Sequence, residues 1–207
     1  MRGRFLTTGE RVSRFEADLA RFAGRKRAVG VTSGTAGLHL ALVGLGVGEG
    51  DEVITTPISF VATANAVVLA GARPVFAEVE ASTGNIDPAA VESAITEKTR
   101  AILPVHLYGV MCDMGRLAEL ARRNGLLLIE DAAHALEALQ RRGAGVAVNY
   151  RPIHLYRFYR ENFGGREGRF PRAEHIGAST ISLPLYPKLT EEEADYVAAS
   201  LAESMKE

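Results

Sequence analysis

Short apolar runs alternate with helix-type segments along the first two thirds of the chain, and this order restricts the fold more than any other feature. The runs typical of strands lie at 28–32, 53–56, 74–79, 101–106 and 126–130. The segments with helical spacing lie at 12–22, 36–45, 59–70, from 87 onward and at 113–123. Strands separated by single helices are joined by right-handed crossovers, which makes neighbouring strands parallel. The alternation therefore predicts an α/β fold, with a mainly parallel sheet flanked by helices.

The composition of the chain indicates a globular protein with one sizeable core. Of its 207 residues 47% are hydrophobic, and its formal net charge is -1 with acidic and basic residues interspersed. Such a charge gives no electrostatic reason to expect nucleic acid or an anionic membrane as partner. No apolar run approaches the roughly 18 residues of a membrane span, and the lone Cys112 excludes a disulfide framework. We therefore expect a cytoplasmic protein.

Two carboxylates directly follow the last apolar run. Leu126 to Ile129 is unbroken, as in a strand buried on both faces, and Glu130 and Asp131 come next. Ligands of open α/β sheets bind at the carboxyl ends of the strands, which makes Asp131 a candidate site residue. His134 lies one helical turn further on if a helix begins here. Taken alone, the stretch favours the simpler alternative, in which Asp131 only caps that helix.

Residues 33–35, Ser-Gly-Thr, stand at the junction between a predicted strand and a predicted helix. Free N–H groups at a helix N-terminus together with a hydroxyl can bind an anion, and glycine lets a phosphate approach the backbone closely. The surrounding glycines match neither a Walker loop nor a dinucleotide-binding motif, so an ordinary capped helix is an equal alternative. Phe60 stands at a similar junction, where it either lies on a flat ligand or belongs to the core.

Two kinds of chemistry fit Asp131 and its neighbours. A buried carboxylate that faces a pyridine nitrogen keeps this nitrogen protonated, which is the arrangement that pyridoxal phosphate chemistry uses. His106, Asp131 and His134 also have the donor types of a metal site, although nothing in their spacing requires one. An anion site, an aromatic side chain and an acid at one sheet edge are together consistent with pyridoxal phosphate chemistry.

The same segments resemble, in order, the sugar aminotransferases of the DegT/DnrJ/StrS family, which are pyridoxal-phosphate enzymes acting on nucleotide-linked keto-sugars. The segments that carry the resemblance are 33–42, 50–66, 74–79, 84–88, 104–109 and 130–135. Three others, 150–155, 170–174 and 183–190, resemble the C-terminal portion of the family. The resemblance implies a truncated pyridoxal-phosphate-dependent transferase fold of type I, like that of aspartate aminotransferase, with a C-terminal α+β segment.

The resemblance also implies which residues hold the cofactor, pyridoxal 5'-phosphate. Gly34, Thr35 and Ala36 would hold its phosphate, and Phe60 would stack on its ring. Asp131 would pair with the pyridine nitrogen.

The remaining implied contacts concern the ring oxygen and the substrate. His134 would lie close to the ring oxygen, and Tyr150 and His154 would lie on the side of the sugar nucleotide. The partners would be a nucleotide-linked keto-sugar and an amino-donor amino acid, with glutamate as the expected donor. Family members work as homodimers, so a second copy of the chain is the expected protein partner.

The chain departs from the family after residue 138. In the family, the segment matching 130–135 is followed by a long stretch that contains the lysine of the Schiff base. Here residues 139–143 already resemble sequence much further along. The lysines of the chain, none of which has the family motif around it, are Lys26, Lys98, Lys188 and Lys206. No residue is therefore assigned to catalysis.

This departure divides the chain into two predicted parts. Residues 1–138 would form an incomplete cofactor-binding large domain, and residues 139–207 a C-terminal small-domain segment. For the second part and the residues before it, the pattern predicts a helix at 132–142, strands at 145–150 and 181–185, and a final helix at 190–205.

The function expected for the parent family is amino transfer to a nucleotide-linked keto-sugar in polysaccharide biosynthesis, and this chain is expected to be inactive alone. Two alternatives stay open at this point. One is a non-catalytic remnant that binds cofactor or a partner. The other is a metal-dependent hydrolase that uses His106, Asp131 and His134.

Overall fold

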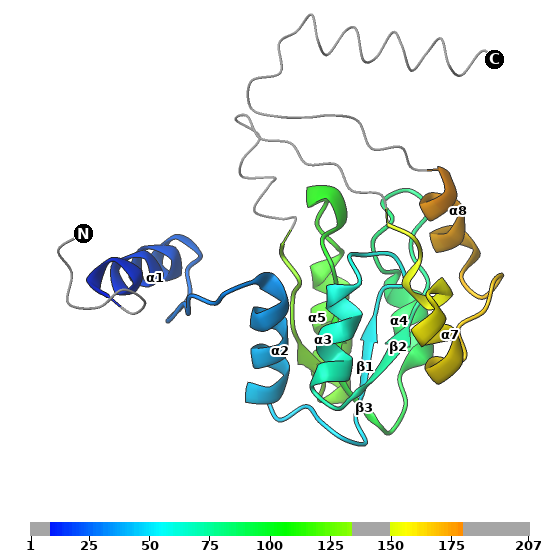
Figure 1. Ribbon diagram of the computed structural model, residues 1–207, viewed down its shortest axis with the longest axis horizontal. Helices are drawn as coiled ribbons and strands as arrows, with labels where there is room; N and C mark the ends of the chain where they lie inside the picture. Colours follow the sequence, from blue (N-terminus) through cyan, green and yellow to red (C-terminus); the bar gives the residue numbers. More distant parts are fainter. Residues whose placement is uncertain (1–8, 134–149, 180–207) are drawn as a thin grey trace, which may run out of the picture.

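A parallel sheet with helices on both faces forms the body of the protein (Figure 1). The computed structural model describes residues 9–133 and 150–179. Its strands are β1 (Glu52–Thr55), β2 (Arg73–Phe76), β3 (Thr99–Leu103) and β4 (Leu127–Leu128), in the order β2-β1-β3-β4. Its helices are α1 (Glu10–Phe22), α2 (Gly34–Gly44), α3 (Ala62–Leu69), α4 (Pro88–Ala94), α5 (Met114–Asn124), α7 (Arg157–Phe163) and α8 (Pro171–Ser179), with short 3-10 turns η1 (Leu107–Gly109) and η2 (Ile153–Leu155). This confirms the predicted α/β class.

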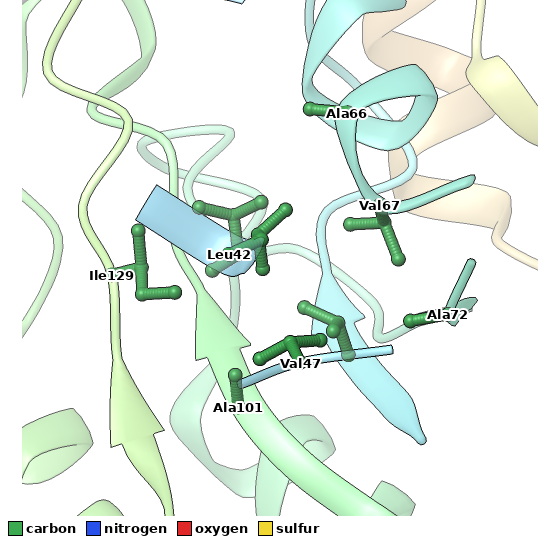
Figure 2. Close-up of a cluster of buried hydrophobic side chains, with 9 residues drawn as sticks. Leu42, Val47, Ala66, Val67, Ala72, Ala101 and Ile129 are labelled. Carbon is green, nitrogen blue, oxygen red and sulfur yellow. The ribbon is translucent and has the colours of Figure 1, made fainter. Parts of the chain in front are cut away.

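Alternate residues of the strands point to opposite faces of the sheet, and each face has its own hydrophobic core. On one face, Leu42 of α2 and Val67 of α3 pack with Ala101 of β3 (Figure 2). Val53 and Leu103 of the strands belong to the same cluster. Because successive side chains of a strand alternate, the residues that precede or follow these along each strand point to the other face. The two cores therefore hold the strand ends in a fixed position.

The second face is covered by α4 and α5. Ile54 and Ile102 pack there with Val91 of α4 and Leu117 of α5, and all four side chains are fully buried. The central strands β1 and β3 are thus buried on both sides. The run 126–129, for which the sequence predicted burial on both faces, forms the edge strand β4 instead, and Leu126, Leu127 and Leu128 are only half-buried.

The helices begin and end at residues that satisfy their free backbone groups. Ser33 accepts a hydrogen bond from the N–H of Ala36 at the start of α2, and Asp87 caps α4 directly before Pro88. Asp113 caps α5 in the same way, and Gly125 ends α5 in the left-handed conformation, with φ 66°. Local sequence thus sets where the chain leaves each helix and enters the next strand.

The predicted strand at 28–32 is not formed, which corrects the sequence interpretation. Val29 and Val31 are 76% and 43% exposed, and the segment has no strand neighbour in the part of the chain that the structure describes. The N–H of Gly30 donates instead to Oε1 of Glu16, at 2.7 Å. A strand is stable only when a neighbour satisfies its backbone groups, so an alternating pattern alone does not produce one.

Four predicted elements lie essentially outside the described residues. These are the helix at 132–142, the strands at 145–150 and 181–185, and the helix at 190–205. The division at residue 138 also falls there, so the two predicted parts stay a prediction.

The described C-terminal residues pack directly on the sheet body. The N–H of Ile153 donates to the carbonyl of Pro57, and the Tyr159 hydroxyl donates to Oδ1 of Asn65 in α3 at 2.7 Å. The carboxylate of Glu78 accepts hydrogen bonds from the N–H groups of Arg172 and Ala173 in the first turn of α8. These contacts connect η2, α7 and α8 to the end of β1, to α3 and to the segment after β2.

Replacing Glu78 with alanine is expected to lower the free energy of unfolding by about 1 kcal/mol, because the first turn of α8 loses its acceptor. Urea denaturation followed by circular dichroism measures this change. Glu161→Ala is the matched control, since Glu161 pairs with Arg157 on the exposed surface of α7 and should change nothing measurable. Equal effects of the two substitutions would contradict the proposed role of Glu78.

Candidate functional site

A cavity of about 310 Å3 lies at the carboxyl edge of the sheet. Its walls come from the start of α2, the residues that lead into α3, and the segments that follow β3 and β4. The residues that line it are Ser33, Gly34, Thr35, Leu38, Ser59, Phe60, Ala62, Thr63, Val105, Asp131, Ala133 and Tyr150. The structure therefore brings together the three junctions that the sequence marked as candidates.

The residues at the start of α2 line the cavity, and their first backbone N–H groups have no partner within the helix. The first hydrogen bond of this helix runs from the N–H of Gly37 to the carbonyl of Ser33, so the N–H groups of Gly34 and Thr35 precede the helical ladder. The N–H of Ala36 donates to the Ser33 hydroxyl at 3.1 Å, and Ala36 is not among the residues that line the cavity. Gly34 and Thr35 are therefore the better placed of the three predicted phosphate contacts.

Asp131 lines the cavity, with only 8% of its surface exposed. Its Oδ2 accepts a hydrogen bond from the Thr63 hydroxyl at 2.8 Å, and its Oδ1 accepts one from the N–H of Ala133 at 3.2 Å. The bond to Ala133 is a local contact, and the helix at 132–142 that Asp131 would cap lies essentially outside the described residues, so the cap stays a prediction. The bond to Thr63, a residue 68 positions away, shows that the carboxylate also belongs to the cavity.

Phe60 belongs to the cavity wall and not to the core. Its side chain is 56% exposed, and its ring centroid lies 6.2 Å from that of Tyr150 at an interplanar angle of 46°. An exposed phenylalanine beside a buried acid provides a flat apolar surface for a ring. Of the two alternatives that the sequence left open for Phe60, the structure supports the surface that faces a ligand.

His106 is not available as a metal ligand. Its Nδ1 accepts the N–H of Cys112 at 3.2 Å, and its Nε2 lies 3.1 Å from Oε2 of Glu130, so both ring nitrogens are engaged. No group of three metal-binding side chains occurs in the part of the chain that the structure describes, and His134 lies outside it. The interpretation of His106, Asp131 and His134 as a metal site is therefore not supported.

Cys112 is also unsuited to catalysis. Burial raises the pKa of its thiol to about 12, which keeps it protonated at neutral pH.

The two predicted substrate residues have different environments. Tyr150 lines the cavity, whereas His154 is fully buried and does not line it. Nε2 of His154 lies 2.9 Å from Oε1 of Glu174 in α8. Burial lowers the pKa of His154 below its ordinary value of 6.5, although Glu174 acts in the opposite direction. A direct contact of His154 with substrate stays a prediction.

No lysine lines the cavity among the described residues. Lys98 comes immediately before β3, at the opposite edge of the sheet, and Lys26 is exposed between α1 and α2. Lys188 and Lys206 lie outside the described residues.

Sequence reasoning missed Ser59 and Thr63, which bring two buried hydroxyls next to Asp131. Ser59 Oγ lies 3.0 Å from Thr63 Oγ1, and both side chains are almost completely buried. No local pattern indicates this contact, because Ser59 lies before α3 and Asp131 is 68 positions from Thr63.

Comparison with known proteins relates this chain to one enzyme family. The model of the DegT/DnrJ/EryC1/StrS aminotransferase family matches residues 1–139 and 136–202. The pleiotropic regulatory protein of Geobacillus stearothermophilus is 51% identical over 138 residues, which are 67% of this chain and 37% of that protein. The GDP-perosamine synthase of Caulobacter vibrioides is 47% identical over 135 residues, which are 65% of this chain and 36% of that protein. The chain thus spans little more than a third of these relatives.

A solved structure of DesV from S. venezuelae, in complex with a ketimine intermediate, superposes on the chain with a TM-score of 0.84 and 25% identity. The superposition covers 97% of this chain and 90% of DesV. The neighbours in this comparison are pyridoxal-phosphate-dependent sugar aminotransferases, which confirms the predicted fold class in a truncated form.

The environment of His154 makes the stability of the fold depend on pH. The unfolded chain protonates this histidine near its ordinary pKa of 6.5, whereas burial lowers the pKa in the folded protein. The free energy of unfolding should therefore fall as the pH decreases from 7 to 5. Burial raises the pKa of Glu174, but the hydrogen bonds that its carboxylate accepts from Gly168, His154 and Phe170, together with the charge of His154, lower it below the ordinary value of 4.5. This group therefore affects stability only below about pH 4.5.

Urea denaturation at several pH values measures this slope, which His154→Gln should flatten. His39 in α2 is partly exposed, so His39→Gln is the control that should keep the wild-type slope. A wild-type slope in the His154→Gln protein would assign the pH dependence to other groups.

Proposed function

Because the chain belongs to the DegT/DnrJ/EryC1/StrS aminotransferase family, we propose that its cavity binds pyridoxal 5'-phosphate or its amino form, pyridoxamine 5'-phosphate. The observation that carries this proposal is the buried carboxylate of Asp131, which shares one cavity with the N-terminus of α2. The cofactor has a phosphate at one end of its ring and a basic nitrogen in the ring, so it matches both features.

The start of α2 would hold the phosphate. Backbone N–H groups and the helix dipole both favour an anion at this position, and Gly34 and Thr35 have N–H groups outside the helical ladder. Ala36 takes part through the hydrogen bond that keeps Ser33 at the start of the helix. The ring would lie against Phe60, whose exposed face is apolar.

Asp131 would hold a proton on the pyridine nitrogen. When bound, the cofactor supplies an electron sink for reactions at the amino-bearing carbon, and this property requires a protonated ring nitrogen. A buried carboxylate is a suitable partner, because an ion pair is stronger where water is excluded. The carboxylate is already oriented by Thr63 and by the N–H of Ala133.

The activity of the parent protein would be transfer of an amino group, with glutamate as donor, to a nucleotide-linked keto-sugar in polysaccharide biosynthesis. The GDP-perosamine synthase to which the chain is similar supports this substrate class. Tyr150 and His154 would face the sugar nucleotide, and His134 the ring oxygen. The protein would act in the cytoplasm as a homodimer. No helix in the described residues is long and apolar enough to cross a membrane.

The second candidate is a chain that binds the cofactor without catalysing amino transfer. A lysine amine is needed to bind the cofactor covalently and to move a proton between substrate and cofactor carbons. Lys26 and Lys98, the lysines that the structure describes, are both away from the cavity. We therefore propose that this chain by itself binds cofactor but does not turn over.

Pyridoxamine 5'-phosphate, which needs no lysine for binding, tests the cofactor site. Its dissociation constant, measured by fluorescence titration, should rise about tenfold or more in Asp131→Asn, because a hydrogen bond between charged groups is lost. Asp113→Asn is the control, since Asp113 only caps α5 and asparagine caps a helix equally well. Unchanged affinity in Asp131→Asn would remove the proposed role of this carboxylate.

The isolated chain, supplied with pyridoxal 5'-phosphate, glutamate and a nucleotide-linked keto-sugar, is expected to form no 2-oxoglutarate. A coupled dehydrogenase assay detects this product, and a full-length family member serves as positive control. Sustained turnover by the purified chain would contradict the proposal and would require an amine that the described cavity does not contain.

A further inference from the structure

Thr63 connects two elements that are far apart in the sequence. It lies in the first turn of α3, is 1% exposed, and its Oγ1 is within hydrogen-bond distance of three oxygens. These are Oδ2 of Asp131 at 2.8 Å, Oγ of Ser59 at 3.0 Å and the carbonyl of Phe60 at 3.1 Å. The hydroxyl therefore stands between the helix and the carboxylate that follows β4.

The number of protons available decides which group is the donor in each of these contacts. An ionised carboxylate and a carbonyl only accept hydrogen bonds, and the Thr63 hydroxyl has one proton to donate. The carboxylate is the nearer and the charged acceptor, so it receives this proton in preference to the carbonyl of Phe60. Ser59 then donates its own proton to Thr63. The order of donation is Ser59 to Thr63 to Asp131.

Helix capping does not account for this arrangement. The residue that precedes α3 is Val61, which makes no side-chain capping hydrogen bond, and the short contact of Thr63 is directed to another element. The other oxygen of Asp131 is held by the N–H of Ala133, and its backbone N–H donates to the carbonyl of Pro104. The Thr63 hydroxyl is thus the group from another element that fixes how the Asp131 carboxylate is rotated about its side-chain bond.

We propose that the hydroxyls of Ser59 and Thr63 are positioning groups that orient the Asp131 carboxylate toward the ring nitrogen of the cofactor. This inference rests on the proposed function of the cavity. Neither hydroxyl takes part in the chemistry itself. Their effect should be specific to ligands that carry a pyridine nitrogen, because they act only through Asp131.

The test compares two probes, pyridoxamine 5'-phosphate and its 1-deaza analogue, in which a carbon replaces the ring nitrogen. The wild-type chain should bind the nitrogen-containing probe about tenfold more tightly, and fluorescence titration gives the ratio of the two dissociation constants. Thr63→Val removes the hydroxyl but keeps the shape, and should reduce this ratio to within about threefold of one. Thr63→Ser restores a hydroxyl and should restore the ratio.

Ser59→Ala is a second variant that does not depend on the folding of Thr63→Val, and it should reduce the ratio by about twofold. Circular dichroism establishes that each variant is folded. A wild-type ratio in both Thr63→Val and Ser59→Ala would overturn the inference, as would equal losses of affinity for the two probes, since that result indicates a structural role. If the wild-type chain binds neither probe, the proposed function fails instead.

Discussion

The site depends on a backbone contact between the segments that follow β3 and β4. The N–H of Asp131 donates to the carbonyl of Pro104 at 2.9 Å, and the N–H of His106 donates to the carbonyl of Asp131 at 3.2 Å. These bonds extend the parallel pairing of the strands to the point where the cavity begins. The carboxylate of Asp131 is thereby fixed opposite α2 and α3, the elements that carry the anion site and the hydroxyl of Thr63.

Sequence patterns predicted the parts of the fold that depend on local periodicity. Four of the five apolar runs became β1 to β4, and the helices after Ser33 and Asp87 begin at these residues, whose side chains cap them. The role of Asp131 could not be decided in this way, because a cap and a cavity residue have the same local sequence. Only the hydrogen bond from the Thr63 hydroxyl, which belongs to another element, identifies Asp131 as a cavity residue.

The segment at 28–32 shows why features that depend on distant parts of the chain could not be predicted from local sequence. Its alternating valines are typical of a strand, but a strand requires a neighbour, and the outer side of β4 likewise has none among the described residues. The chain spans little more than a third of the length of the relatives reported above, and no lysine lines the cavity among the described residues. A local pattern therefore indicates what a segment favours, and the remaining chain decides whether it forms.

The central claim is that Asp131 and the start of α2 hold the two ends of one B6 cofactor. A crystal structure of the chain with pyridoxamine 5'-phosphate tests it most directly. The account predicts the phosphate at the N–H groups of Gly34 and Thr35, and the ring nitrogen within hydrogen-bond distance of the Asp131 carboxylate. A cofactor bound with its ring nitrogen turned away from Asp131, or bound outside this cavity, would contradict it.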